Sequence, residues 1–180
     1  MKQIRLNVFE TNSSSSHSLV IRSNKLMTEL NESTYFTHDE MLDSLWSIED
    51  GEYQSLREDW CFGRSPFRAL DTFELRFQYA YANYCYDDNK LNELIELLKK
   101  LVPEVKSIKR PEYVGVDEPY LSSWLATNNI SLEEFLTNKK YIVIQDGDEY
   151  CIWDDLVRSG LIDTKELDIV GEDVENYEGY

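Results

Sequence analysis

The amino-acid sequence predicts an α+β fold, in which one compact domain has a small, mostly antiparallel sheet covered by a helical hairpin. The chain has 180 residues, a length typical of a single domain. Hydrophobic residues make up 42% of it, which is enough to build a core. Strand-like segments stand near both ends of the sequence, and helix-like segments lie between them. We therefore assign residues 1–170 to one domain and expect residues 171–180 to form a mobile acidic tail.

Two strands joined by a polar loop are predicted first. Residues 4–8 alternate between apolar and polar side chains, as a half-buried strand does, and residues 19–21 form a short apolar run. Residues 10–18 between them are rich in serine, a residue that favours turns.

Two short helices are predicted from capping boxes. Thr37 and Glu40 have the spacing at which the first side chain caps a helix and the second binds back to the cap, so a helix should follow directly. Ser131 and Glu134 repeat this spacing. Residues 49–59 are acidic and are assigned to a loop.

The longest helix is predicted over residues 66–85. Ser65 and Pro66 fit an N-cap and the first helical position. Large apolar side chains then recur every three or four residues, at Phe67, Leu70, Phe73, Phe77, Tyr81 and Tyr84. We expect this stripe to face the core. Not all of the neighbouring tyrosines can reach one core, so we expect some to be exposed among Tyr79, Tyr81, Tyr84 and Tyr86.

A second helix over residues 89–102 would complete the hairpin. The segment Asp87-Asp88-Asn89 can cap its start, and Pro103 ends it. Residues 104–118 are predicted to form a loop that holds a short strand, and residues 119–126 to form one or two helical turns.

The last third of the chain carries a strong strand signal. A strand is predicted over residues 141–145. The Asp-Gly pair at 146–147 predicts a tight turn, and a returning strand is expected over 149–152. A short helix over residues 153–160 and a last strand over 167–170 complete the expected elements.

Charge is the strongest global signal. Thirty-five Asp and Glu stand against 18 Lys and Arg, which gives a net charge of −17. Such a field repels phosphate backbones and anionic membranes, so we expect neither nucleic acid nor a membrane as a direct partner. A basic surface on a host protein is the expected partner, although a high charge also serves solubility alone. The acids that we expect to face this partner crowd ten positions, and they are Asp146, Asp148, Glu149, Asp154 and Asp155.

The sequence also indicates a cytoplasmic protein. No stretch approaches the roughly 18–20 apolar residues that span a bilayer. The N-terminus lacks the apolar run of a secretion signal. The odd number of cysteines argues against a disulfide framework, and we expect reduced, mostly buried thiols at Cys61, Cys85 and Cys151.

The serine-rich loop is the first candidate for chemistry. Its polar side chains could bind a phosphate or a sugar, and they are Asn12, Ser13, Ser14, Ser15, Ser16 and His17. His17 could also act as the base for a serine nucleophile, but the nucleophile motifs GxSxG and SxxK are absent from the sequence. A structured turn without catalytic function remains the alternative. We therefore predict no catalytic residue.

Metal and cofactor sites are not predicted. His17 and His38 are the two histidines and lie far apart in sequence, and the seven glycines are isolated, so no nucleotide-binding glycine motif exists. One basic run stands out in this acidic chain, and it comprises Lys99, Lys100, Lys106, Lys109 and Arg110. These side chains could pair with acids of the same protein or bind an anion.

Two segments resemble a known group of sequences. Residues 8–21, VFETNSSSSHSLVI, resemble the opening of a family of small proteins in phages and prophages of Gram-positive bacteria. Residues 135–150, FLTNKKYIVIQDGDEY, resemble a later segment of similar proteins. The resemblance implies a phage accessory protein that acts on the host, and it carries no catalytic residues over to this chain.

These observations lead to one functional hypothesis and two alternatives. We expect a phage-encoded acidic binding protein that inhibits or modulates a host protein, for example as a nucleic-acid mimic that blocks a defence nuclease. The first alternative is a binder of a nucleotide or sugar, or an enzyme, that uses the serine-rich loop and His17. The second is a phage structural or assembly protein. A concave pocket with converging polar groups would favour a ligand binder, whereas a broad acidic face would favour a mimic.

Overall fold

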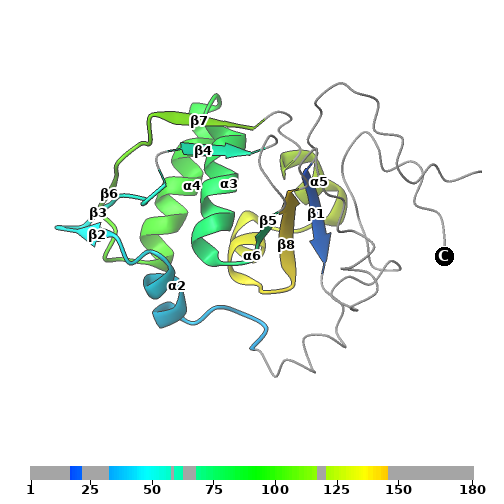
Figure 1. Ribbon diagram of the computed structural model, residues 1–180. Coiled ribbons are helices and arrows are strands. Elements are labelled where there is room, and N and C mark those ends of the chain that lie inside the picture. The colour runs from blue at the N-terminus through cyan, green and yellow to red at the C-terminus, as the bar shows by residue number, and fades with distance from the viewer. Residues whose placement is uncertain (1–16, 22–32, 58, 63–67, 117–120, 146–180) are drawn as a thin grey trace, which may run out of the picture.

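The computed structural model of the chain describes residues 17–21, 33–57, 59–62, 68–116 and 121–145 (Figure 1). The predicted strand 4–8 and all elements predicted after Gln145 lie outside these residues.

The prediction of a small α+β fold is confirmed (Figure 1). The described helices, in chain order, are α2 (His38–Ser44), α3 (Phe73–Tyr84), α4 (Asp88–Leu101), α5 (Leu121–Asn128) and α6 (Leu132–Thr137). The described strands are β1 (His17–Ile21), β2 (Ile48–Glu49), β3 (Glu52–Tyr53), β4 (Asp59–Phe62), β5 (Arg68–Leu70), β6 (Ser107–Ile108), β7 (Tyr113–Val116) and β8 (Tyr141–Gln145).

The strands form three small groups. One sheet has the order β1-β8-β5 and is antiparallel throughout. A second sheet has the order β2-β3-β6, in which β2 and β3 form an antiparallel hairpin and β6 runs parallel to β3. In the third group β4 runs parallel to β7. The segment after β2 therefore pairs twice with the segment after α4, first through β3 and β6 and then through β4 and β7.

Three predicted helix starts are confirmed by their caps. The Thr37 hydroxyl accepts a hydrogen bond from the Glu40 N–H at 3.3 Å, and the Glu40 carboxylate accepts one from the Thr37 N–H at 2.8 Å. Ser131 caps α6, and Asp87 caps α4. Each cap satisfies N–H groups that the first helical turn leaves without a partner.

The predicted start of the longest helix was wrong. Residues 68–70 form β5, which pairs with β8, and α3 begins at Phe73 behind the cap Thr72. The Thr72 hydroxyl accepts a hydrogen bond from the Leu75 N–H at 3.3 Å. The strand pairing fixes an extended backbone at residues that also fit a helical spacing, and the helix can begin only after it.

Helix α3 lies at the centre of the fold, beside α4 and in contact with α2, α6, β4 and β7 (Figure 1). It is buried nearly all round, and its buried side chains include the predicted stripe Phe73, Phe77, Tyr81 and Tyr84. Tyr79 is buried as well, whereas Tyr86, beyond the helix end, is 87% exposed. The expectation that some of these tyrosines are exposed therefore holds for Tyr86.

A cluster of aromatic rings forms the core beneath β3 and β4. Trp60 stacks on Tyr53 with ring centres 6.1 Å apart, and the edges of Phe77 and Tyr81 meet it at 6.0 and 4.9 Å. All four side chains are almost fully buried. Each such ring pair contributes about 0.5–1.5 kcal/mol beyond the burial of apolar area, so this cluster holds the short strands on α3.

A buried arginine ties α3 to the corner between α6 and β8. Arg76 is fully buried, and its guanidinium donates hydrogen bonds to the carbonyls of Asp71, Phe135 and Asn138. The last two carbonyls stand at the C-terminal end of α6, where the helix dipole favours a positive charge.

Candidate functional site

The site residues predicted from the sequence fall almost wholly outside the described part of the chain. The residues outside the described part include Ser13 to Ser16 and the acids from Asp146 to Asp155. For His17 the structure describes the backbone alone. His17 pairs with Gln145 in the β1–β8 ladder. The strand ends from which the two candidate segments leave are therefore side by side, although they are more than a hundred residues apart in sequence.

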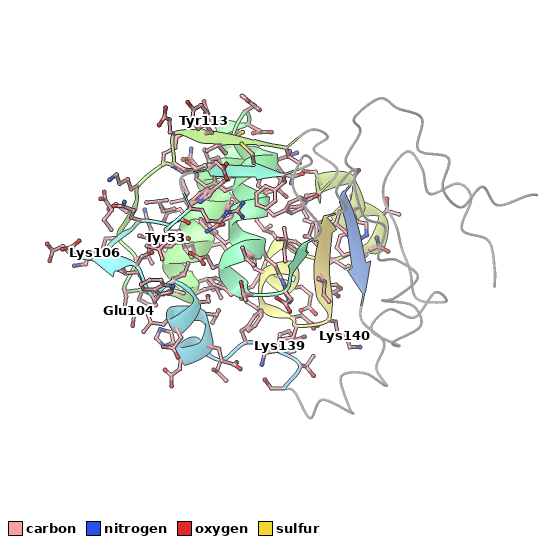
Figure 2. The ribbon with its side chains drawn as sticks, in the orientation of Figure 1. Tyr53, Glu104, Lys106, Tyr113, Lys139 and Lys140 are labelled. Atoms are coloured by element: carbon pink, nitrogen blue, oxygen red, sulfur yellow. The ribbon has the colours of Figure 1, made fainter. Side chains whose placement is uncertain are left out.

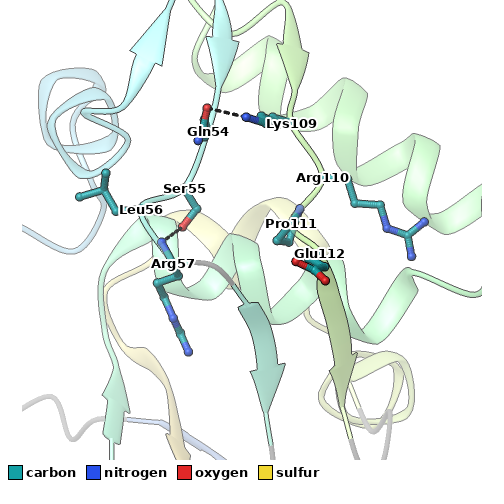
Figure 3. A pocket seen from close by; sticks show the side chains of 8 residues that line it. All are labelled: Gln54, Ser55, Leu56, Arg57, Lys109, Arg110, Pro111 and Glu112. Atoms are coloured by element: carbon teal, nitrogen blue, oxygen red, sulfur yellow. Dashed lines mark hydrogen bonds between the residues drawn. The ribbon is translucent and has the colours of Figure 1, made fainter.

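The described residues instead show two neighbouring hollows. The first has a volume of about 710 Å³ and is named here the acidic hollow, since three carboxylates line it. Its lining residues are Trp46, Ser47, Ile48, Glu49, Asp50, Glu52, Gln54 and Leu56. The second has a volume of about 480 Å³ and is named the basic hollow. Its lining residues are Gln54, Ser55, Leu56, Arg57, Lys109, Arg110, Pro111 and Glu112 (Figure 3).

The acidic hollow is built around the hairpin of β2 and β3. Asp50 and Gly51 both have positive φ, 52° and 86°, as the two-residue hairpin turn with the twist of the strands requires. The Gly51 carbonyl accepts hydrogen bonds from the N–H groups of Lys106 and Ser107 at 2.7 and 3.1 Å. The turn is thereby anchored to β6, which holds the acids at the edge of the small sheet.

Two large apolar side chains line the same hollow as these acids. Trp46 is 69% exposed and Leu56 is 65% exposed. None of Glu49, Asp50 and Glu52 forms a salt bridge with another described residue. The surface around the hollow thus combines unpaired negative charge with exposed apolar area.

The basic hollow lies between two chain segments that separate after one strand pair and meet again in the next. The chain segments of β3 and β6 are hydrogen-bonded, diverge over residues 54–57 and 109–112, and meet again as β4 and β7. Lys109 spans the opening and donates a hydrogen bond from Nζ to Gln54 Oε1 at 3.1 Å (Figure 3). The hollow is therefore framed by backbone that both ladders hold in place.

The floor of the basic hollow is a buried polar network. Gln78 is fully buried, and its side-chain amide donates to the Tyr53 hydroxyl at 2.9 Å and to the Ser55 hydroxyl at 3.0 Å. Tyr53 in turn donates to Glu74, and its place in the interior is shown in Figure 2. Burial and the neighbouring Glu74 carboxylate raise the pKa of the Tyr53 hydroxyl above its usual range, so this hydroxyl stays neutral.

Three bases and one acid line the basic hollow. Arg57 lies over the ring of Phe62 at 5.6 Å and approaches Asp59 through Nη2 at 3.5 Å. Its other terminal nitrogen, Nη1, is buried and has no hydrogen-bond partner among the described residues. Neither Lys109 nor Arg110 forms an ion pair with another described residue. The Arg110 side chain extends outward from the rim of the hollow (Figure 3).

The basic run predicted from sequence is therefore divided. Lys99 pairs with Glu96 at 2.8 Å and Lys100 with Glu133 at 2.7 Å, which confirms the pairing with acids of the same protein. The side chain of Lys106 lies against Gly51. Lys109 and Arg110 line a hollow instead, where an anion could bind.

Two further ion pairs are found on α2. His38 Nε2 lies 3.1 Å from Glu104, and Lys139 Nζ lies 2.7 Å from Glu40. Figure 2 labels Glu104 and Lys139. The hydrogen bond to Glu104 raises the pKa of the His38 ring. A hydrogen bond from Lys139 lowers the pKa of the Glu40 carboxyl. These contacts join α2 to the chain after α4 and to the turn before β8.

Among the described residues, no group of His, Cys, Asp and Glu could hold a metal ion, and no helix is long and apolar enough to cross a membrane. The expectation that cysteines are mostly buried is wrong for Cys61, which is exposed on β4, whereas Cys85 is half-buried. Cys61 alternates with the buried Trp60 and Phe62, so the strand pleat directs it outward.

Comparison with known proteins gives no relative. The chain matches no protein-family model, no curated protein and no solved structure.

Sequence reasoning assigned residues 49–59 to a loop and found neither hollow. One signal was present, since Asp50-Gly51 is the same dipeptide that predicted a tight turn at 146–147. The basic run marked Lys109 and Arg110, but no local signal places residues 54–57 opposite them, because Gln54 and Lys109 are 55 residues apart in sequence.

Proposed function

We propose that this protein is an acidic binding protein that inhibits or modulates a basic partner protein, and that the acidic hollow contacts this partner. The observation that carries the proposal is the exposure of Trp46 and Leu56 in the same hollow as three carboxylates that form no salt bridge with another described residue. Aromatic and apolar anchors at the centre of an interface contribute most of the binding energy, and surrounding charges select the partner.

The occupant that fits this surface is a basic protein segment with an apolar side chain. Trp46 would cover the apolar side chain and lose its contact with water. Glu49, Asp50 and Glu52 would accept hydrogen bonds from lysine or arginine of the partner. Single exposed pairs contribute about 0–1 kcal/mol each, so the affinity would depend on the apolar anchors and on several charges acting together.

The overall charge of −17 supports the same proposal, since it attracts a basic partner over several ångströms and speeds association. The acids Asp146, Asp148, Glu149, Asp154 and Asp155 would add to this attraction. A phage protein that acts in the cytoplasm of its bacterial host, as the resemblance of residues 8–21 implies, would meet such a surface on a nucleic-acid-binding defence factor. Its carboxylates would then take the place of a phosphate backbone.

The test is capture of a partner from bacterial lysate at low and high salt, followed by measurement of its affinity for purified variants. Glu49→Gln/Glu52→Gln should weaken binding about fivefold to thirtyfold at low salt and flatten the salt dependence. Trp46→Ala should weaken binding at both salt concentrations, because its contribution is apolar. Asp88→Asn/Glu93→Gln on α4 changes the net charge equally and is the control.

The proposal is contradicted if the control and the Glu49/Glu52 variant bind with the same affinity and the same salt slope. In that case the charge acts only at long range or serves solubility, and the acidic hollow is not the contact surface.

A further inference from the structure

The basic hollow is an unexpected feature in a chain of net charge −17, and the proposed protein interface does not use its bases. We propose that it binds a small phosphorylated molecule. The inference goes beyond the proposed function, since the ligand is a small anion and not a protein.

The Ser55 hydroxyl is a hydrogen-bond donor in the lining of the basic hollow. Its oxygen accepts two hydrogen bonds, one from the Arg57 N–H at 3.0 Å and one from the Gln78 side-chain amide at 3.0 Å. A hydroxyl has two acceptor sites and one donor, so both acceptor sites are occupied and the proton is left to donate. The Tyr53 hydroxyl oxygen is one acceptor within reach of this proton. Because Ser55 also lines the hollow, the proton can turn from Tyr53 to an anion bound there.

A buried amide beneath Ser55 holds this hydroxyl in place. Gln78 is fully buried on α3 and reaches Ser55 from below, so the orientation of the hydroxyl is fixed by the core. A donor whose direction is set before binding costs little further ordering when an anion arrives.

Three bases of the lining supply positive charge to the basic hollow. Lys109 has a neutral partner, the Gln54 carbonyl oxygen, and its charge is not offset by an acid among the described residues. Arg57 has one buried nitrogen, Nη1, without a partner in the same part of the chain. Arg110 stands at the rim and adds a third positive charge. A phosphate group offers several oxygens and two charges, which matches separate donors on both sides of one opening.

The size and the remaining lining restrict the ligand further. A volume of about 480 Å³ exceeds a free phosphate ion and suits a molecule of nucleotide size. Leu56 and Pro111 supply an apolar part, and Glu112 can accept a hydrogen bond from a hydroxyl or amino group of the ligand. A phosphate with a polar organic body therefore fits better than an inorganic anion.

The experiment uses ADP without metal as the probe and adenosine as its uncharged counterpart, titrated against the full chain by calorimetry. We expect saturable binding of ADP, competition by inorganic pyrophosphate, and adenosine binding at least tenfold weaker than ADP. The amide resonances of Ser55, Arg57 and Lys109 should shift on addition of ADP.

The decisive comparison uses two double variants from the same basic run. Lys109→Gln/Arg110→Gln should weaken ADP binding at least tenfold. Lys99→Gln/Lys100→Gln removes the same charge from residues that pair with acids, and it should change the affinity less than twofold. Equal effects of the two variants, equal binding of adenosine and ADP, or no saturation at millimolar ADP would overturn the proposal.

Discussion

The acidic and the basic hollow share Gln54 and Leu56 but differ in charge and in construction. The acidic hollow lies on a two-residue turn, and its flanking side chains are exposed. The basic hollow lies between two ladders and above a buried polar network. The difference is one of rigidity: the acidic hollow has exposed, unsupported anchors, as the proposed protein partner requires, whereas the network under Ser55 fixes part of the basic hollow, as the proposed small ligand requires.

Both hollows depend on the same buried residue. Tyr53 is the last residue of β3 and immediately precedes Gln54, the residue shared by the two hollows. Its ring packs on Trp60 and Phe77, and its hydroxyl belongs to the network under Ser55. The two hollows, although opposite in charge, thus lie next to the same aromatic core.

The largest effect is expected from Tyr53→Ala. Loss of a fully buried aromatic side chain leaves a cavity, and the free energy of unfolding should fall by about 3–5 kcal/mol. Urea denaturation measures it. Tyr113→Ala removes an exposed tyrosine from β7 and should cost less than about 1 kcal/mol. Similar losses for the two variants would show that the rings under β3 do not support the fold.

The second prediction separates the two hollows through the turn. Gly51 has φ of 86°, and a Cβ there would lie 2.8 Å from Lys106 Cδ. Gly51→Ala should therefore lower stability by about 1–2 kcal/mol and shift the resonances of the acidic hollow more than those of the basic one. Gly115→Ala is the control, because a Cβ there meets nothing within 4 Å. If Gly51→Ala leaves the stability unchanged, the turn can adopt another geometry that accepts alanine.

Local sequence signals predicted a large part of the fold. The caps Thr37, Asp87 and Ser131 were found because each side chain binds N–H groups two or three residues away. The strand 141–145 was found because its run of β-branched residues is short and dense. Such signals involve neighbours in sequence, and they need no knowledge of the rest of the fold.

Long-range pairing explains the errors. Ala69 pairs with Ile144, so residues 68–70 become a strand although their spacing also suits a helix. Tyr79 is buried because α3 has neighbours on all sides, which a one-sided helical pattern does not show. The basic hollow needs residues 54–57 and 109–112 together, and only the parallel ladders bring them to one place.

The third prediction compares one serine from each hollow. Ser55→Ala removes the acceptor of the Gln78 amide and the Arg57 N–H and should cost about 1 kcal/mol of stability. It should also weaken ADP binding severalfold, since the fixed hydroxyl donor is lost. Ser47→Ala in the acidic hollow should change neither quantity measurably. Calorimetry measures the ADP affinity, and urea denaturation measures the free energy of unfolding. Equal results for the two serine variants would contradict a role for Ser55 in ADP binding and in stability.

The smallest effect is expected from a surface pair outside both hollows, His38 and Glu104. The hydrogen bond with Glu104 raises the pKa of His38, so the stability from its protonated form is present below the ordinary value of 6.5 and is lost as pH rises through the raised value. A hydrogen bond from its own backbone, with a further one from His38, lowers the pKa of Glu104. That contribution is present above the ordinary value of 4.5 and is lost as pH falls through the lowered one.

The pair should therefore stabilise the fold most between about pH 4.5 and 6.5. The difference in the free energy of unfolding between the wild type and His38→Gln, followed from pH 4 to 9, should be largest in this window and decline on both sides. Glu104→Gln should show the same loss between about pH 4.5 and 6.5, but part of its effect should persist at higher pH, because this variant also removes the carboxylate that accepts the backbone hydrogen bond. ADP binding at pH 5.5 should be the same in His38→Gln as in the wild type, since α2 lines neither the Ser55 floor nor the opening spanned by Lys109. A difference in stability that is constant across this pH range would assign the contribution of His38 to packing and not to its charge.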